Sequence, residues 1–214
     1  MTNTKAYGHE TQVFTIGHSN HTMDQFVRLL KAAKIDAIAD VRSVPFSRQW
    51  PQFNRHELKA ALRNVEISYV FMGDQLGARP KDRECYQNGT AAYSLIAKMP
   101  GFIDGLERIK RGAQEKNIAL MCAERDPLDC HRTILVARHL QNQGIAIFHI
   151  LADGSIESNK NIEKRLLDLT EMRTGDLFSK PISTEEAIAN AYEYRGQVIA
   201  YKEERGTLKE MVEE

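Results

Sequence analysis

The sequence predicts an α/β protein with a doubly wound, Rossmann-like and mostly parallel sheet of about five strands, helices on both faces, and a C-terminal helical extension. Two observations lead to this fold class. Short apolar and β-branched runs alternate with segments in which apolar residues recur at helical spacing. The runs are apolar at consecutive rather than alternate positions, which is typical of parallel strands covered on both faces.

Capping signals place the first predicted helices. Thr22 stands three positions before Gln25, the spacing of a capping box, so a helix is expected to begin after Thr22. Asn54 is expected to cap a second helix, Arg55–Val65. The strands predicted around these helices are Val13–Gly17, Ala37–Val41 and Ser68–Met72.

The second half of the core continues the alternation. Pro100 is expected at the start of a helix, because proline fits the first helical turn. A later helix, Cys130–Gln143, is closed by Gly144, which suits the left-handed residue after a helix. The strands predicted beside these helices are Ile118–Cys122 and Ala146–Leu151.

These elements predict one core domain with appendages. Within it, Gly73–Tyr93 has several glycines and no apolar period, so a long loop or lid is expected. Two amphipathic segments, near Ile162–Leu169 and Glu185–Tyr194, are expected to be helices docked on the core. The predicted divisions are a flexible N-terminus at 1–12, the α/β core at 13–153, the helical extension at 154–202 and a frayed tail at 203–214.

Charge and cysteine content limit the classes of function. Twenty-nine basic and 29 acidic residues cancel, so no overall field favours a large nucleic-acid face or a membrane surface. The N-terminus lacks the apolar segment of a signal peptide, and no run approaches the roughly 18 apolar residues of a membrane span. A cytoplasmic protein is therefore expected, and its three widely spaced cysteines suit reduced thiols.

Polar residues follow three of the predicted strands. Because ligands bind outside the carboxyl ends of parallel strands, these residues are expected to share one crevice. The expected catalytic residues are His18, Asp40, Cys122, Glu124, Cys130 and His131, and the expected substrate-binding residues are Ser19, Arg42, Ser43 and Arg132.

Cys130 is a candidate nucleophile in this set. It stands at a predicted helix start, where the positive end of the helix dipole and nearby Arg132 favour the thiolate. His18 or His131 would transfer the proton.

Structural explanations compete with these roles. Cys122, at the end of an apolar strand, could be a small core residue. Asp40 and Arg42 could form an ordinary ion pair, or they could make an anion cradle with an orienting carboxylate. Cys85 is expected to be incidental.

Known motifs narrow the chemistry. A phosphatase loop needs five residues between its cysteine and arginine, whereas Cys130 and Arg132 have one residue between them. The sequence has no Walker loop, dinucleotide fingerprint or nucleophile elbow. Zinc or iron stays open as a cofactor, although adjacent Cys130 and His131 rarely bind one ion together. The candidate metal ligands are Cys122, Cys130, His131 and His18.

Several sequence blocks point to a family. They include Thr15-Ile16-Gly17-His18-Ser19, Asp40-Val41-Arg42-Ser43-Val44-Pro45, Leu76-Gly77, Cys122-Ala123-Glu124 with Cys130-His131-Arg132, and Ile199-Ala200-Tyr201. Together they resemble the family catalogued as domain of unknown function 488. The resemblance implies an α/β protein and no particular activity. The family's recurring polar residues map here onto His18, Ser19, Asp40, Arg42, Cys122, Glu124, Cys130, His131 and Arg132.

The preferred hypothesis is an enzyme of the hydrolase or transferase class that acts on a nucleotide or on a base in nucleic acid. Arg42 and Arg132 would hold an anionic group, and Glu124 or Cys130 would attack or activate the reacting centre. Two alternatives stay open: a metal- or thiol-dependent redox or hydrolytic enzyme, and a non-catalytic module that binds an anionic metabolite. The expected partner is a small anionic ligand or nucleotide, with nucleic acid as a second candidate and no membrane.

Overall fold

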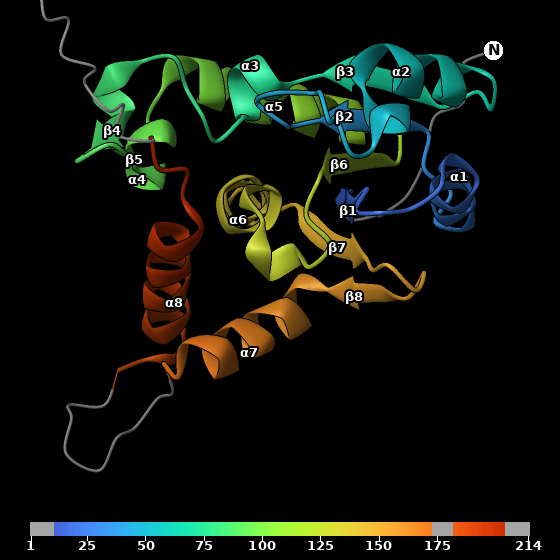
Figure 1. The fold of residues 1–214 in the computed structure, drawn as a ribbon. Helices are drawn as coiled ribbons and strands as arrows, with labels where there is room; N and C mark the ends of the chain where they lie inside the picture. Colours follow the sequence, from blue (N-terminus) through green and yellow to red (C-terminus); the bar gives the residue numbers. More distant parts are fainter. Residues whose placement is uncertain (1–10, 173–181, 204–214) are drawn as a thin grey trace, which may run out of the picture.

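A six-stranded sheet forms the centre of the protein in the computed structural model, which describes residues 11–172 and 182–203. The strand order is β3-β2-β6-β1-β7-β8, and all neighbours are parallel except β7 and β8 (Figure 1). The chain runs outward from β1 to β3 and then returns to place β6 and β7 on either side of β1, so the predicted α/β fold is confirmed. The strands are β1 (Gln12–Gly17), β2 (Ala37–Asp40), β3 (Ser68–Phe71), β6 (Ile118–Cys122), β7 (Ala146–Ile150) and β8 (Ile156–Ser158).

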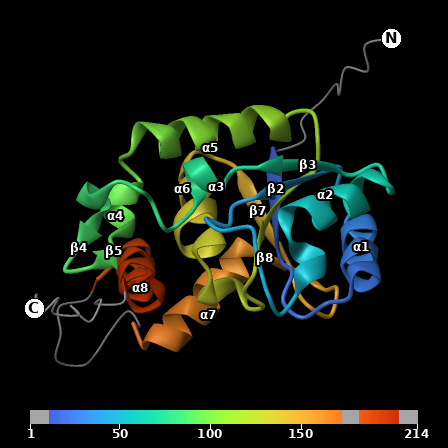
Figure 2. The same ribbon diagram turned by 45° about the horizontal axis from the view of Figure 1, so that its top comes forward.

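Helices cover both faces of the sheet (Figure 2). The helices α1 (Met23–Ala32) and α2 (Arg55–Arg63) pack on one face, through a cluster that includes Met121 of β6. The helices α5 (Pro100–Ala113) and α6 (Arg138–Asn142) pack on the other face, through a cluster that includes Leu120. Neighbouring residues of a fully buried strand thus serve opposite faces, which explains why the run is apolar at every position.

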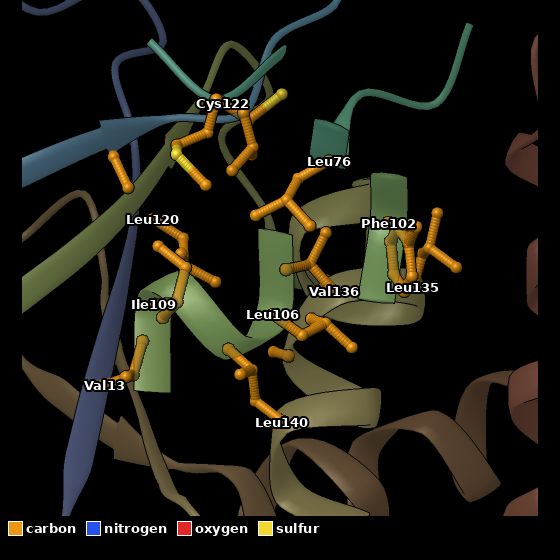
Figure 3. Close-up of a cluster of buried hydrophobic side chains, with 14 of the residues drawn as sticks. Val13, Leu76, Phe102, Leu106, Ile109, Leu120, Cys122, Leu135, Val136 and Leu140 are labelled. Atoms are coloured by element: carbon orange, nitrogen blue, oxygen red, sulfur yellow. The ribbon is translucent and has the colours of Figure 1, made fainter. Parts of the chain in front are cut away.

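Cys122 belongs to the α5 and α6 side of the core. Figure 3 shows it with Leu120 of the same strand, in the buried cluster that also contains Leu106 of α5. It is 3% exposed, as a core residue would be, and its functional role stays a prediction. Cys122 is also the last residue of its strand, where the core gives way to the polar edge of the sheet.

Smaller elements complete the chain. A third cluster of buried residues joins the C-terminal helices α7 (Asn159–Thr170) and α8 (Thr184–Ile199) to Leu128 and Ile134. The remaining helices are α3 (Gly73–Leu76) and α4 (Tyr93–Ile96), the 3-10 helices are η1 (Pro51–Phe53), η2 (Arg83–Cys85) and η3 (Pro127–Asp129), the π-helix is η4 (Arg132–Ala137), and the small hairpin is β4 (Tyr86–Gln87) with β5 (Thr90–Ala91).

Local sequence signals act as expected at most helix ends. The Thr22 side chain accepts from the Gln25 backbone N–H and the Gln25 side chain accepts from the Thr22 N–H, which completes the capping box. Pro100 occupies the first turn of α5. Asn54 precedes α2, but its side chain makes no cap and instead accepts from the Ser47 N–H at 2.7 Å. The side-chain cap predicted for Asn54 is therefore wrong, because the preceding loop takes its oxygen.

Two parts of the chain differ from the expected organisation. Residues 154–202 were expected to be helical, yet they begin with β8, an antiparallel edge strand of the main sheet. The expected loop at Gly73–Tyr93 contains α3 and the β4–β5 hairpin, and β5 is tied to the end of the chain by a bridge between Thr90 and Lys202. The predicted flexible N-terminus and frayed tail lie almost wholly outside the described residues.

No helix in the described part of the chain is both long enough and apolar enough to cross a membrane.

Candidate functional site

The ends of β1, β2 and β6 meet at one edge of the sheet. The backbone N–H of His18 donates to the Cys122 carbonyl at 2.9 Å, and the N–H of Val41 donates to the Met121 carbonyl at 3.1 Å. These bonds extend the sheet just beyond its strands. The structure therefore brings together the three loops that carry the candidate residues.

Two adjacent hollows open at this edge. The inner hollow, about 350 Å³, is lined by Cys122, His131 and Tyr201 among others. The outer hollow, about 440 Å³, is lined by residues that include His18, Ser19 and Trp50. The residues that line both are Arg42, Val44, Phe46, Ala123 and Glu124.

Two thiols and one imidazole converge on the floor of the inner hollow. His131 Nδ1 lies 3.7 Å from Cys122 Sγ and 3.9 Å from Cys130 Sγ. Its Nε2 lies 3.0 Å from the carbonyl oxygen of Val41, which can only accept a hydrogen bond, so Nε2 carries a proton. The Nδ1 atom thus faces the two sulfur atoms.

The backbone explains how adjacent residues share this cluster. Cys130 is extended, with φ −135° and ψ 138°, whereas His131 is helical, with φ −60° and ψ −25°. The change of direction turns both side chains toward Cys122. Side chains of adjacent residues thus reach one cluster, and whether they bind one ion together stays open.

The surroundings shift the pKa values of the two thiols in opposite directions. Burial raises the pKa of Cys122, and the charges of Cys130 and Glu124 raise it further. Burial also works against the Cys130 thiolate, but hydrogen bonding with Cys122 and the positive charges of Arg132 and His131 hold the pKa of Cys130 well below its ordinary value. Of the two thiols, Cys130 therefore has the lower pKa.

Glu124 stands over the cluster. Its Oε2 accepts from Cys130 Sγ at 2.8 Å, while the residue as a whole is exposed to both hollows. Burial of the carboxyl end raises the pKa of Glu124, and the charge of Cys130 adds to the effect, although the solvent in the hollows weakens both. Cys130 is 1% exposed and does not line either hollow, so Glu124 is the group that a ligand meets.

Arg132 has a different place from the one predicted for an anion clamp. It is fully buried, and its Nη1 and Nη2 donate to the backbone carbonyls of Glu124 and Arg125 at 2.8 and 3.3 Å. It begins the π-helix η4, a geometry that is rare and frequent near functional sites. This placement favours holding the Glu124 loop, and direct contact with an anion stays a prediction.

Asp40 and Arg42 form a buried pair. Asp40 Oδ2 accepts from Arg42 Nη2 and from the Tyr69 hydroxyl, both at 2.7 Å, and Asp40 Oδ1 accepts from Arg42 Nε at 2.9 Å. Arg42 also donates to the Phe53 carbonyl at 2.8 Å and to His18 Nε2 at 3.2 Å. Four of its five N–H groups are therefore used, and one remains for a ligand. Asp40 orients Arg42 and has no free oxygen with which to act as a base.

His18 lines the outer hollow in a neutral form. Its Nδ1 donates to the Ser19 carbonyl at 3.0 Å, its Nε2 accepts from Arg42, and its ring stacks on Phe53 with centroids 4.4 Å apart. Burial and the charge of Arg42 lower the pKa of His18 to about 4. These contacts favour positioning of Arg42, and the proton transfer predicted for His18 stays untested.

The two serines lie where the sequence places them. Ser43 lines the inner hollow and its hydroxyl accepts from the Arg79 N–H at 3.0 Å. Ser19 lines the outer hollow and its hydroxyl donates to the Asn20 side chain at 3.2 Å. Both are therefore available at the rim, and Ser43 also fixes the segment that carries Arg79.

Sequence reasoning missed several residues of the inner hollow. Arg79 is exposed at its rim, with Cζ 4.3 Å from the Tyr201 ring centroid, and within the described ranges no carboxylate pairs with it. Tyr93 and Phe46 also line this hollow, as does the acidic Asp129. The unusual length of the 73–93 segment was the one signal for Arg79 and Tyr93.

Metal binding is feasible at one place in residues 11–172 and 182–203. The ligand atoms of Cys122, Cys130 and His131 all lie within 4.8 Å of one another. His18, the fourth candidate from the sequence, is not in this group.

The fold and site define a class: a doubly wound α/β protein with a thiol, imidazole and carboxylate cluster beneath hollows at the carboxyl edge of its sheet. A family model described as Domain of unknown function DUF488 matches residues 22–139. The chain belongs to this family. The match includes Asp40, Arg42 and the Cys122-to-Arg132 loop, and it begins after His18. No significant match links the chain to a curated protein or to a solved structure.

Proposed function

We propose that the protein is an enzyme, of the hydrolase or transferase class, that acts on a nucleotide or on a base carried by a small anionic ligand. The observation that carries the proposal is the position of Glu124. Its carboxylate faces both hollows and touches the Cys130 thiol behind it. A reactive carboxylate between a polar cluster and an accessible hollow is typical of an active site.

The rim of the inner hollow supports an anionic ligand with a flat ring. Arg79 offers an exposed guanidinium without an acidic partner among the described residues, and Arg42 offers one spare N–H. Tyr201 and the 60%-exposed Phe46 provide rings on which a base could stack. A cavity of about 350 Å³ suits a mononucleotide better than a duplex.

Glu124 would do the work at the reacting atom. As a carboxylate it could take a proton from a nucleophile or attack an electrophilic carbon itself. Cys130 and His131 would set its charge and orientation from behind, since Cys130 is too deeply buried to meet the ligand. Arg132 would keep the loop in place through the Glu124 carbonyl.

Turnover of a panel of nucleosides and nucleotides, followed by mass spectrometry, tests this function. The wild-type protein should convert at least one member, and Glu124→Gln should lower the rate by about 100-fold or more, as expected for an acid–base group. Glu115→Gln, on an exposed turn, is the matched control and should keep the wild-type rate. Binding without any turnover would instead favour a module that senses an anionic metabolite.

A further inference from the structure

We propose that Cys122, Cys130 and His131 bind one Zn²⁺ ion through three protein ligands, with the fourth position open to the inner hollow beside Glu124. This inference rests on the proposed function for its substrate but not for the metal, which binding alone can test.

The distances between the ligand atoms match a tetrahedral zinc ion. With Zn–S of about 2.3 Å and Zn–N of about 2.0–2.1 Å, a tetrahedral angle places sulfur and nitrogen ligands about 3.6 Å apart. The two corresponding distances are 3.7 Å for Cys122 and 3.9 Å for Cys130, both measured to His131 Nδ1. All three ligand atoms lie within 4.8 Å of one another, whereas two sulfur ligands of a tetrahedral zinc ion stand about 3.8 Å apart, so a shift of about 1 Å or less closes the shell.

The imidazole is held as a metal ligand would be. Histidine ligands usually donate the other ring N–H to a carbonyl or carboxylate, which fixes the tautomer and the ring orientation. His131 Nε2 donates to the Val41 carbonyl at 3.0 Å. In the neutral ring that a metal would bind, this bond keeps the proton on Nε2 and leaves the lone pair of Nδ1 directed at the two sulfur atoms.

The donor set favours zinc over magnesium and calcium. Two thiolates and one imidazole are softer than the oxygen ligands that magnesium and calcium require. Two thiolates also cancel the charge of the ion, which favours binding at a place where Cys122 and Cys130 are 3% and 1% exposed.

The open fourth position on the zinc ion would face Glu124 and the inner hollow, where it could hold a water molecule that reacts with the substrate. In nucleobase deaminases, a zinc ion with two cysteine ligands and one histidine ligand activates water for hydrolytic removal of the amino group. A glutamate that is not a zinc ligand transfers the proton. Here the bound water would lose a proton to the Glu124 carboxylate, and the resulting hydroxide would form a C–O bond to an electrophilic carbon. The bond from that carbon to an amine or alkoxide would break, and the leaving group would depart with the proton from Glu124. The net reaction consumes one water.

Metal content and cobalt spectroscopy test the proposal with the metal alone. The full-length protein, stripped with chelator and reloaded with Zn²⁺, should hold one equivalent. Loading with Co²⁺ should give thiolate-to-cobalt charge-transfer bands and the intense visible bands of tetrahedral cobalt. Absence of both the equivalent and the bands, or a strong preference for iron with no affinity for zinc, would overturn the proposal.

Variants test the assigned ligands. Cys122→Ser, Cys130→Ser and His131→Asn should each weaken zinc binding by more than about 100-fold, beyond the loss seen when only a partner of a ligand is removed. Cys85→Ser changes a buried cysteine outside the cluster and should keep zinc. Glu124→Gln should also keep it, and loss of zinc in that variant would overturn the open fourth position. Circular dichroism checks that each variant is folded. If a variant does not fold, the cobalt spectrum of the wild-type protein still tests the site.

The two proposals fail in different ways. Failure of the stripped protein to bind zinc, together with turnover that still depends on Glu124, would overturn the zinc site and leave the proposed function intact. Bound zinc with no turnover of any nucleotide would do the reverse.

Discussion

The Nε2 atom of His131 donates a hydrogen bond to the backbone carbonyl of Val41 at 3.0 Å. This bond connects the residue after β2 to the start of the helical segment that follows β6. Because a carbonyl can only accept, the bond fixes the proton of the ring on one side and directs Nδ1 at Cys122 and Cys130.

Arg132 should be a main support of the site. Arg132→Ala removes a fully buried side chain and two hydrogen bonds from a charged group, so the free energy of unfolding should fall by about 3–5 kcal/mol. Denaturant unfolding measures the change. Arg28→Ala, an exposed arginine on α1, is the control and should stay within about 0.5 kcal/mol of wild type. An equally small loss for Arg132→Ala would contradict the role.

The buried pair of Asp40 and Arg42 should show strong coupling. Asp40→Ala leaves the guanidinium buried without its counter-ion and should destabilise the protein by about 3–5 kcal/mol. The double variant Asp40→Ala/Arg42→Ala removes the orphaned charge as well, so its loss should be smaller than the sum of the two single losses. Urea unfolding of the four proteins gives the coupling, and simple additivity would be evidence against a mutually dependent pair.

The free energy of unfolding should fall at acidic pH because His149 becomes protonated on unfolding. This fully buried imidazole lies 2.9 Å from Thr15 Oγ1 and 2.9 Å from Asn159 Oδ1, and burial lowers its pKa to about 4. Between pH 6.5 and 4 His149 is protonated in the unfolded chain but stays neutral in the folded protein. The contribution of neutral His149 to the free energy of unfolding is therefore complete above pH 6.5 and is lost as pH falls toward 4. The loss should approach about 3 kcal/mol.

The measurement is unfolding free energy against pH, compared with His149→Gln. The variant should start less stable at neutral pH and show a shallower loss between pH 6.5 and 4. His18, whose pKa is also lowered to about 4, keeps part of the slope in both proteins. Parallel curves for wild type and variant would exclude His149 as a source.

Gly17 should be intolerant of a side chain. A Cβ atom there would overlap the Glu124 carbonyl oxygen, the same atom that Arg132 holds. Gly17→Ala should therefore cost about 2 kcal/mol or more and displace the Glu124 loop. Gly101→Ala, in open space within α5, should be neutral or stabilising by up to about 1 kcal/mol. Equal thermal unfolding temperatures for the two variants would contradict the close approach.

The sequence predicts the parallel strands of the sheet well because strands buried on both faces are apolar at every position. β6 is apolar at every position and buried at every position, and the capping box at Thr22 marks a helix start without reference to the rest of the chain. β8 was missed because it has three residues, pairs only at the sheet edge, and buries none of its side chains fully. An edge strand of this kind depends on its neighbour rather than on its own composition.

The sequence predicts which loops form the site, but not where each side chain of those loops points. The rule that ligands bind at strand ends brings His18, Arg42 and Glu124 together without any knowledge of distances. The direction of a side chain is a different matter. Arg132 looks like an anion clamp in the sequence, yet its guanidinium turns inward to the loop carbonyls. Arg79 and Tyr201 are far apart along the chain, and only the folded structure stacks one on the other.

The most direct test of the account asks where a nucleotide binds. The protein also has a larger hollow of about 610 Å³, lined by Lys98, Arg138 and His139 among others, which shares Tyr93 with the inner hollow but is not lined by Glu124. In an NMR titration with mononucleotides, the account predicts amide shifts concentrated at Ser43, Arg79, Ala123 and Glu124. Shifts confined to residues around Arg138 and His139, with the Glu124 loop unchanged, would contradict it.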